Sequence, residues 1–406
     1  MTGTVPIEAP QAAGGRPLGE RWFGVGRSSL GDSAEAGRAA ASAALDGRPA
    51  ALLMVFSSDG YDPRELLAGI GSVSAGAPLI GCSTAGELSD EGAGDNSVVI
   101  AAIGGPGFRV RTAAGLASSA GLRKAGASAG SCVADLGPED AGNRVMVLLS
   151  DGRAGDQAEV IRGVHEVVGS GVPLAGGCAG DAVRSEGTFQ MLGGEVHTDS
   201  VVAAAISSDG PIGLGWSHGW ESVGEPILIT GSAGNRICTI DDDPALDRYL
   251  DHLDAPEEAR VDADAFSSWA RLHPLGLGRR RSGQQPARCV NAADFDERAL
   301  ICTAEVPQGG LAWFMRGDVA SVLDSTRNAC GQALIDFDGA APLGVLAFNC
   351  IGRRGILGDD GIRREAEMIG EFSEAPFAGF YTLGEIARTR GVNAVHSQTL
   401  VALALG

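Results

Sequence analysis

The sequence lacks a long apolar run. A helix that spans a bilayer needs about 18 or more consecutive apolar residues, and no run of uncharged apolar residues among the 406 approaches that length. The N-terminus also lacks the apolar block of a signal peptide, because Glu8 and Pro10 interrupt it. We therefore expect a cytoplasmic protein without a membrane segment, whose first 18 residues form a disordered tail.

Positive charge is scarce. The chain has 31 Lys and Arg against 51 Asp and Glu, which gives a formal net charge of −20 at neutral pH. A surface with this excess of negative charge repels phosphate backbones and anionic lipid. We therefore expect neither nucleic acid nor a membrane surface as a partner.

Paired cysteine motifs are absent. The eight cysteines include no C-x-x-C pair, so neither a zinc site nor a disulfide framework is expected, and no metal site is predicted. Cys82, Cys178 and Cys350 each lie within a repeated segment described below. The simplest interpretation is that they are small buried hydrophobic residues beneath tight turns. The alternative is that the repeats bring them near one another in space.

Common catalytic motifs are also missing. Segment 81–85 departs from the G-x-S-x-G nucleophile elbow at its last position, and the chain contains neither a G-x-x-x-x-G-K-[ST] loop nor an H-E-x-x-H motif. We expect no enzymatic activity. An enzyme with Cys82 or Ser83 as nucleophile, and Glu87 or His396 as base, is the alternative that a depressed pKa of the Cys82 thiol would favour.

The sequence does contain an 11-residue pattern that occurs twice. Residues 78–88 and 376–386 share the frame P-x-x-G-x-x-T-x-G-E-[LI]. A third, degenerate copy occupies residues 173–181, where the spacing between the glycines is one residue shorter and Asp181 replaces the glutamate. The pattern therefore indicates an internal repeat.

Each copy of the pattern belongs to a longer unit. In the first, an apolar run at 52–56 predicts a buried strand, Asp62 and Pro63 predict a helix start, and apolar residues then recur at helical spacing. The unit is β-α-β-turn-β, in which the crossover makes the first two strands parallel and the short turn lets the last strand return antiparallel. The returning strands are predicted at 98–103, 201–206 and 400–405.

These units predict an α/β fold of mixed sheets covered by helices, built from repeated β-α-β-β units in two domains. A chain of 406 residues exceeds the size at which one core usually stops growing. The repeats are interrupted between the second and third copies. Turn-forming residues near Asp241 and Pro244 place the domain boundary there. The predicted N-terminal domain spans 19–240 and the C-terminal domain spans 241–406.

The repeated T-x-G-E segments carry chemistry suited to a small ligand. Thr84 and Thr382 offer hydroxyls, Glu87 and Glu385 offer carboxylates, and the nearby glycines offer backbone N–H groups at the carboxyl end of a strand. This set suits a zwitterion: a glutamate would accept the ammonium of an amino acid while Arg353 or backbone N–H groups hold its carboxylate. The alternative is that Thr and Glu bond to neighbouring backbone and only fix the turn.

Five ordered segments resemble the FIST proteins, in both their N-terminal and C-terminal FIST domains. The segments are 81–87, 176–181, 348–353, 379–385 and 396–399. The resemblance implies intracellular sensing of a small molecule, with amino acids or related metabolites as ligands. FIST domains resemble input modules of chemoreceptors, histidine kinases and diguanylate cyclases. Because no such output module is visible in this chain, we expect it to signal through a separate partner protein.

The residue chemistry and the resemblance together give one set of predicted ligand-binding residues. These are Cys82, Ser83, Thr84, Gly86, Glu87, Asp181, Arg353, Tyr381, Thr382, Gly384, Glu385 and His396. A branch of the family resembles haem-bearing nitric oxide sensors, so haem is an alternative ligand, with His165, His197 or His218 as candidate axial ligands. No other cofactor is expected.

Overall fold

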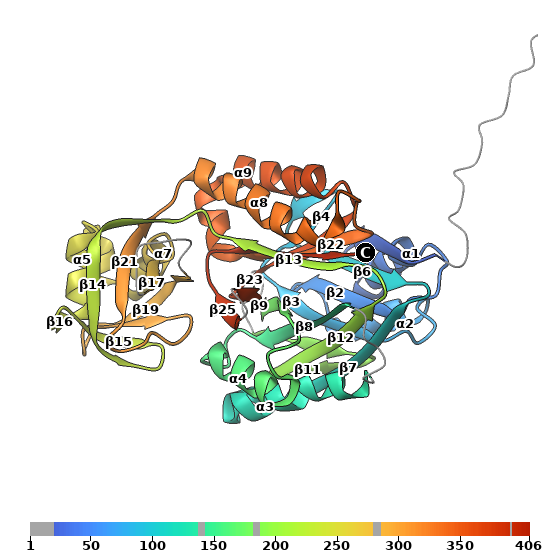
Figure 1. The fold of residues 1–406 in the computed structure, drawn as a ribbon, viewed down its shortest axis with the longest axis horizontal. Coiled ribbons are helices and arrows are strands. Elements are labelled where there is room, and N and C mark those ends of the chain that lie inside the picture. The colour runs from blue at the N-terminus through green and yellow to red at the C-terminus, as the bar shows by residue number, and fades with distance from the viewer. Residues whose placement is uncertain (1–19, 137–142, 182–186, 279–285, 390–391) are drawn as a thin grey trace, which may run out of the picture.

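The chain folds into a large body of three sheets flanked by helices and a smaller domain joined to one side of it, as Figure 1 shows. The prediction of an α/β fold with mixed sheets covered by helices, in two domains, is confirmed. The disordered tail predicted at 1–18 lies outside the described residues. The computed structural model describes residues 20–136, 143–181, 187–278, 286–389 and 392–406.

The large body consists of three units with the same order of elements, which we call units 1, 2 and 3. Unit 1 contains β1 (Trp22–Ser28), α1 (Ser33–Leu45), β2 (Leu52–Ser58), α2 (Pro63–Gly71), β3 (Leu79–Thr84), β4 (Glu87–Ser89), β5 (Gly92–Gly94) and β6 (Val98–Gly104). Unit 2 contains β7 (Phe108–Leu116), α3 (Leu122–Gly130), β8 (Asn143–Asp151), α4 (Gln157–Val168), β9 (Leu174–Ala179), β10 (Gln190–Leu192), β11 (Glu195–His197) and β12 (Ser200–Ser208). Unit 3 contains β13 (Ile212–Ser217), α8 (Val319–Ala333), β22 (Gly344–Cys350), α9 (Ile351–Ser373), β23 (Phe377–Thr382), β24 (Glu385–Thr389), β25 (Val392–His396) and β26 (Leu400–Leu405).

The strand pairing within each unit follows the β-α-β-turn-β pattern expected from the sequence. A crossover helix joins two parallel strands, β2 with β3, β8 with β9 and β22 with β23. The last strand of each unit then returns antiparallel beside the first of these, as β6, β12 and β26. The three sheets therefore share one strand order around the crossover.

The hairpin between the crossover pair and the returning strand leaves its own sheet in every unit. Hairpin β4–β5 of unit 1 pairs with β23 of unit 3, and hairpin β24–β25 of unit 3 pairs with β9 of unit 2. Hairpin β10–β11 of unit 2 pairs with β3 of unit 1. The exchanges form a closed cycle, so each sheet of the large body is completed by a hairpin from another unit.

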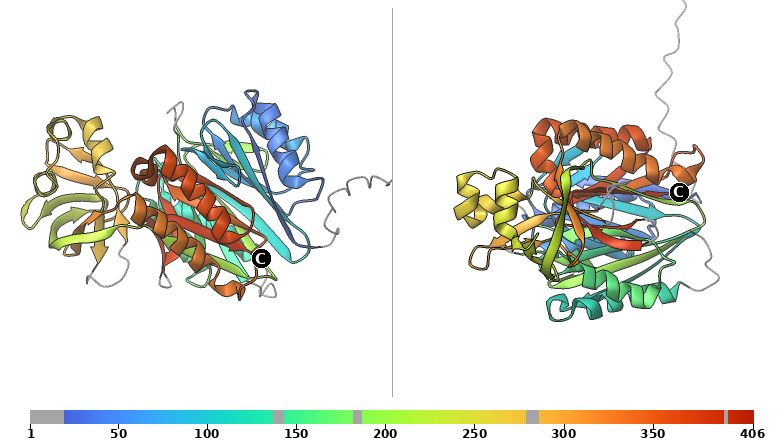
Figure 2. Two further views of the ribbon diagram at one scale, coloured as in Figure 1. Left: turned by 90° about the horizontal axis from the view of Figure 1, so that it is seen from above. Right: turned by 60° about the vertical axis from the view of Figure 1, so that its left-hand side comes forward.

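The inner faces of the three sheets pack around a shared apolar core. Phe56, Phe348 and Phe380 meet at its centre, with ring centroids 4.9, 5.8 and 6.3 Å apart. The helix pairs α1/α2, α3/α4 and α8/α9 cover the outer faces. Figure 2 (right) shows the green helices of unit 2 and the orange and red helices of unit 3 on opposite sides of the body. Strands buried on both faces explain the continuous apolar runs in the sequence.

The smaller domain is inserted into unit 3 between β13 and α8, and we call it the inserted domain. It has its own apolar core, which includes Tyr249 and Phe266. The predicted domain boundary, residue 240, is the last residue of β15, within the inserted domain. Its elements are β14 (Glu221–Ala233), β15 (Arg236–Ile240), β16 (Asp243–Pro244), α5 (Ala245–His252), α6 (Glu257–Val261), α7 (Ala263–Ala270), β17 (Leu275–Gly278), β18 (Ala287–Arg288), β19 (Val290–Asp294), β20 (Ala299–Cys302) and β21 (Leu311–Arg316).

The first crossover helix begins where the sequence predicts. The Asp62 side chain accepts hydrogen bonds from the first backbone N–H groups of α2, and Pro63 is its first residue. Asp156 caps α4 in the same way, and Gly169 ends it with a positive φ of 67° while its N–H donates to the carbonyl of His165. The two helices therefore start at matching points of units 1 and 2.

The first glycine of the repeated pattern is required by close packing of parallel strands. Gly81, Gly176 and Gly379 each lie opposite a residue of the neighbouring parallel strand. A Cβ atom at Gly379 would lie 1.9 Å from the carbonyl oxygen of Ala347, and at Gly176 2.0 Å from that of Leu148. No side chain fits there without moving the strand.

We predict that Gly379→Ala lowers the free energy of unfolding by about 1–3 kcal/mol, because the added methyl group must displace β22. The matched control is Gly331→Ala in α8, where nothing lies within 4 Å of the new Cβ. This change should be neutral or slightly stabilising, since alanine is the better helix former. Urea denaturation of both variants measures the difference, and equal stabilities would contradict the packing argument.

Candidate functional site

The T-x-G-E turn of unit 1 is held by hydrogen bonds to its own glutamate. The hydroxyl of Thr84 donates to Oε1 of Glu87. The backbone N–H and the hydroxyl of Ser97 donate to Oε2 of Glu87, at 3.1 and 2.7 Å. Because Ser97 immediately precedes the returning strand β6, the carboxylate links the exchanged hairpin to the sheet that it leaves.

The turn of unit 3 repeats this arrangement. Thr382 donates to Oε1 of Glu385, and the N–H and hydroxyl of Thr399 donate to Oε2 at 3.1 and 2.7 Å. The N–H of Gly384 donates to the Thr382 hydroxyl at 3.2 Å. Glu87 and Glu385 are fully buried, so these contacts do what the turn-fixing interpretation requires. A role for the same residues in ligand binding stays a prediction.

In unit 2 the equivalent position is occupied by Gln190, which the sequence analysis missed. Gln190 begins the exchanged hairpin and pairs with β3 in the same register as the two glutamates pair with their strands. Its side-chain oxygen accepts from the Ser200 hydroxyl at 2.7 Å. Asp181, which the motif spacing suggested, lies before the hairpin and forms an ion pair with Arg153 at 2.8 Å. A longer connection between β9 and β10 removes the T-x-G-E spacing and hides the equivalence.

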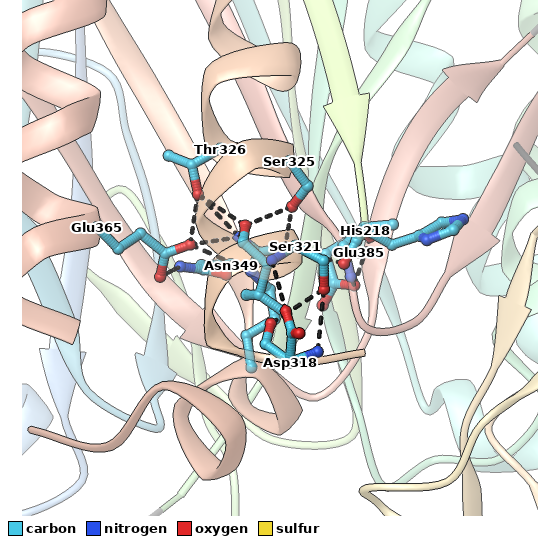
Figure 3. A network of polar contacts seen from close by, with 11 residues as sticks. His218, Asp318, Ser321, Ser325, Thr326, Asn349, Glu365 and Glu385 are labelled. Atoms are coloured by element: carbon cyan, nitrogen blue, oxygen red, sulfur yellow. Dashed lines mark hydrogen bonds and ion pairs between the residues drawn. The ribbon is translucent and has the colours of Figure 1, made fainter. Parts of the chain in front are cut away.

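Arg353 is buried in a network of internal contacts. It is paired with Glu365, and both side chains are fully buried. Its guanidinium also donates to the hydroxyls of Ser325 and Thr326, at 2.8 and 2.9 Å. Figure 3 shows these partners, with Asn349 donating to Glu365 at 2.7 Å. The network joins α8, β22 and α9, and the guanidinium is already neutralised by Glu365, so the predicted contact of Arg353 with a ligand carboxylate would have to break it.

Cys82 and Ser83 lie side by side on β3, and both are fully buried. The Ser83 hydroxyl accepts a hydrogen bond from the N–H of Phe189 at 3.1 Å. Burial raises the pKa of the Cys82 thiol well above its usual value, and the neighbouring Cys178 raises it further. A thiol in this setting stays protonated at neutral pH, which is the opposite of what a nucleophile needs.

The remaining predicted residues are also enclosed. His396 is fully buried and stacks on Trp216 with ring centroids 4.9 Å apart, and burial lowers the pKa of His396 to about 3. The ring of Tyr381 lies 4.7 Å from the Arg354 guanidinium. Gly86 has a φ of 117°, which its tight turn requires. The structure thus distributes the predicted residues over the junctions between units rather than around one open pocket.

A cavity of about 740 Å³ lies between the large body and the inserted domain. One wall is formed by α4 and β25, which contribute Ile161 and Val395, and the other by the inserted domain, which contributes Ile229, Leu277 and Leu311. Cavities of about 300–1,000 Å³ with mainly apolar walls are typical of small-ligand sites. This cavity is therefore the candidate ligand site.

Four polar side chains of the cavity wall, Arg162, His165, Glu305 and Asn393, have side-chain partners in the protein. Arg162 forms ion pairs with Glu159 and with Glu305, which comes from the inserted domain. The Nε2 atom of His165 lies 2.9 Å from Nδ2 of Asn393 on β25. These contacts join α4 to the inserted domain and to the exchanged hairpin that completes the sheet of unit 2.

Arg288 of the cavity wall is hydrogen-bonded to the backbone instead. Its Nε donates to the carbonyl of Glu305 at 3.2 Å and its Nη1 to the carbonyl of Val395 at 3.0 Å. Among the described residues, no carboxylate forms an ion pair with it. Burial lowers the pKa of the Arg288 guanidinium, while Coulombic attraction to Cys302, Asp156 and Glu305 opposes this. The cavity therefore contains a cation that is oriented by backbone and not neutralised.

Unit 1 has the same groove without the cover. A hollow of about 550 Å³ lies between α2 and β11 and is lined by Arg64, Leu67 and Ala68. Counted from the helix caps, Leu67 and Ala68 match Ile161 and Arg162. No described residue of the inserted domain lines this hollow. The inserted domain thus encloses one of two matching grooves.

Each candidate haem ligand makes a contact within the protein. His165 is the one of the three that lines the cavity, and its Nε2 is engaged with Asn393. His218 is buried and its Nδ1 accepts the N–H of Trp220 at 2.9 Å, while Nε2 of His197 lies 3.4 Å from the Glu195 carboxylate. Within the described ranges, no three His, Cys, Asp or Glu side chains are grouped to hold a metal ion. No helix in the described part of the chain is long and apolar enough to cross a bilayer.

Comparisons with known proteins identify two family models that together cover most of the chain. The FIST N domain matches residues 51–243 and the FIST C domain matches residues 245–388. An uncharacterized protein of Mycobacterium tuberculosis is 26% identical over 235 residues, which cover 56% of this chain and 60% of the relative. An uncharacterized protein of Methanocaldococcus jannaschii is 25% identical over 224 residues, 53% of this chain and 41% of the relative. This chain therefore aligns with less than two thirds of the length of these relatives. A crystal structure of a chorismatase covers 96% of this chain and 100% of its own, with 9% identity and a TM-score of 0.35.

We predict that Cys82 resists alkylation in the folded protein. Cys238 is partly exposed, whereas Cys82 is fully buried with a raised thiol pKa. Iodoacetamide treatment followed by mass spectrometry should find Cys238 modified first and Cys82 modified only after unfolding. Rapid labelling of Cys82 would instead support the nucleophile alternative.

We also predict that the two buried glutamates make stability fall as pH rises. Burial raises the pKa of Glu87 and Glu385 from 4.5 to about 7, against the hydrogen bonds that lower it. Between pH 4.5 and about pH 7, the folded protein therefore binds more protons than the unfolded chain. The stability present below pH 4.5 is therefore lost as pH rises through about 7, by on the order of 3 kcal/mol for each group. Glu385→Gln should flatten the profile of unfolding free energy against pH.

Unit 2 offers the matched control for this experiment. Gln190→Glu places a third carboxyl at the equivalent position, so it should steepen the same profile. Denaturation at a series of pH values measures all three proteins. A Glu385→Gln profile parallel to that of the unmodified protein would show that Glu385 does not titrate in this range.

Proposed function

Because this chain belongs to the FIST family, whose domains are sensory domains for small ligands in signal transduction, we propose that it binds an amino acid or a related metabolite. The observation that supports this is the 740 Å³ cavity between the large body and the inserted domain. Its apolar walls and few polar groups have the composition of small-molecule sites. Enzymatic activity is not part of the proposal.

The position of the cavity suggests how binding is transmitted. A ligand there contacts α4 and β25 on one side and the strands of the inserted domain on the other. The ligand therefore stabilises the conformation in which the inserted domain and the large body both contact it. A ligand shifts the equilibrium between two conformations by the difference in its affinity for them. We propose that a separate cytoplasmic signalling protein, such as a histidine kinase or a cyclase, reads this arrangement.

The T-x-G-E turns are the second candidate for the ligand site. Binding there would have to displace the hydrogen bonds that Glu87 and Glu385 receive from Ser97 and Thr399. Leaving such buried donors unpaired costs about 1–3 kcal/mol each. The cavity requires no such displacement, so we favour it. Haem is not favoured, because the histidine in the cavity wall is engaged with Asn393.

We predict that a bound ligand raises the melting temperature of the protein and that Ala158→Phe abolishes the effect. Ala158 is a partly exposed residue of the cavity wall, so a phenyl ring there fills ligand space. Thermal-shift titration with the twenty amino acids and related carboxylic acids measures this. A ligand at one hundred times its Kd should add about 2.7 kcal/mol to the free energy of unfolding.

The control is Ala68→Phe, which fills the uncovered groove of unit 1. It should leave the ligand-induced shift unchanged. If Ala158→Phe still responds to the ligand, the cavity is not the site. If Glu87→Gln or Glu385→Gln alone removes the response in a folded protein, the T-x-G-E turns are.

A further inference from the structure

We propose that Arg288 anchors the carboxylate of an apolar organic acid in the cavity. This inference rests on the proposed function, since it assigns a ligand class to the same site. Arg288 lines the cavity from β18 of the inserted domain. No sequence motif identified it.

The guanidinium of Arg288 is positioned before any ligand arrives. Two backbone carbonyls, those of Glu305 and Val395, accept from its Nε and Nη1 atoms. Its Nη2 atom has no hydrogen-bond partner among the described residues. Because these two contacts already fix the side chain, the planar guanidinium can donate its remaining N–H groups to a carboxylate with little further loss of conformational entropy.

The charge balance of the wall favours an anionic ligand. Of the lining residues, Arg162 and Glu305 form one ion pair, so Arg288 leaves the lining with one positive charge in excess; Glu159, the second partner of Arg162, lies outside the lining. Arg288 is the wall cation without an acidic partner among the described residues. Burial disfavours its charged form, as the lowered pKa indicates. A ligand carboxylate would neutralise it.

The rest of the wall selects the body of the ligand. Ile161, Ile229, Leu277, Leu311 and Val395 present aliphatic surface to the cavity. A phosphate or a sugar would leave most of its polar atoms unpaired against these side chains. An acid with a compact apolar body satisfies both the guanidinium and the aliphatic wall.

The ammonium of an amino acid finds less support. The carboxylate in the wall is that of Glu305, which already pairs with Arg162. A zwitterion would have to share this acceptor, whereas a simple carboxylic acid needs only Arg288. Within the range of amino acids and related metabolites, the geometry therefore points to the deaminated, apolar acids.

Arg288 also joins the two bodies. It belongs to the inserted domain, yet its Nη1 donates to Val395 on β25 of the large body. A carboxylate bound to this guanidinium therefore acts at a contact that holds the inserted domain against the exchanged hairpin. Ligand binding and the position of the inserted domain would be coupled through one side chain.

The test uses phenylacetate, benzoate and hexanoate, each compared with its own amide. We expect at least one of these acids to raise the melting temperature of the protein. The apparent affinity for its amide should be at least tenfold lower. Arg288→Gln should reduce the affinity for the acid at least tenfold by isothermal titration calorimetry. Arg288→Lys keeps the charge but loses the paired N–H donors of the guanidinium. Its affinity for the acid should lie between those of the unmodified protein and Arg288→Gln. Arg236→Gln is the control, because Arg236 lies in the same domain but pairs with Asp294 outside the cavity.

Each outcome separates this inference from the proposed function. Equal binding of acid and amide, lost in Ala158→Phe, would overturn the role of Arg288 and leave the cavity as the site. Undiminished binding of the acid by folded Arg288→Gln would do the same. Arg288-dependent binding of amino acids but of none of the acids would overturn the ligand class and keep the anchor. If neither the acids, the amides nor the amino acids bind, both proposals fail together.

Discussion

The cyclic exchange of hairpins is the constraint on which the large body depends. Each of its sheets contains four strands of one unit and two of another, so the hydrogen bonds at one edge are supplied from a distant part of the sequence. The buried glutamates lie where two of these hairpins depart, and Gln190 lies where the third does. The most regular feature of the sequence, the T-x-G-E turn, is thus explained by what the exchange requires of the backbone.

Local features of the fold were predictable from the sequence. The apolar runs gave the buried strands, and Asp62 and Pro63 gave the start of α2, because these signals act over a few residues. The exchange was not predictable, since nothing in a hairpin's own sequence records which sheet it joins. The burial of Arg353 was missed for a related reason: its partner Glu365 lies 12 residues further along, on the far side of a break at Gly358 in α9.

The cavity shows the same limit more clearly. Its walls come from α4, β25 and the inserted domain, three segments that are remote in sequence and share no motif. Arg288 has no feature that distinguishes it from the other arginines until the contacts are known. What creates the site is the place of the insertion in unit 3, which sets the inserted domain over a groove that in unit 1 is open.

The exchange also has a consequence for how the chain reaches its native state. Strands β3, β9 and β23 have exposed edges until a hairpin from another unit arrives, and unpaired edges are where chains associate wrongly. The hairpin that completes unit 2 comes from the last part of the chain. During synthesis on the ribosome, the sheet of unit 2 therefore waits, with its edge open, until β24 and β25 of unit 3 have been made. Such delayed, long-range pairing is typical of slow folding, and a chaperone that shields β9 in that interval would cover an edge at which wrong association can begin.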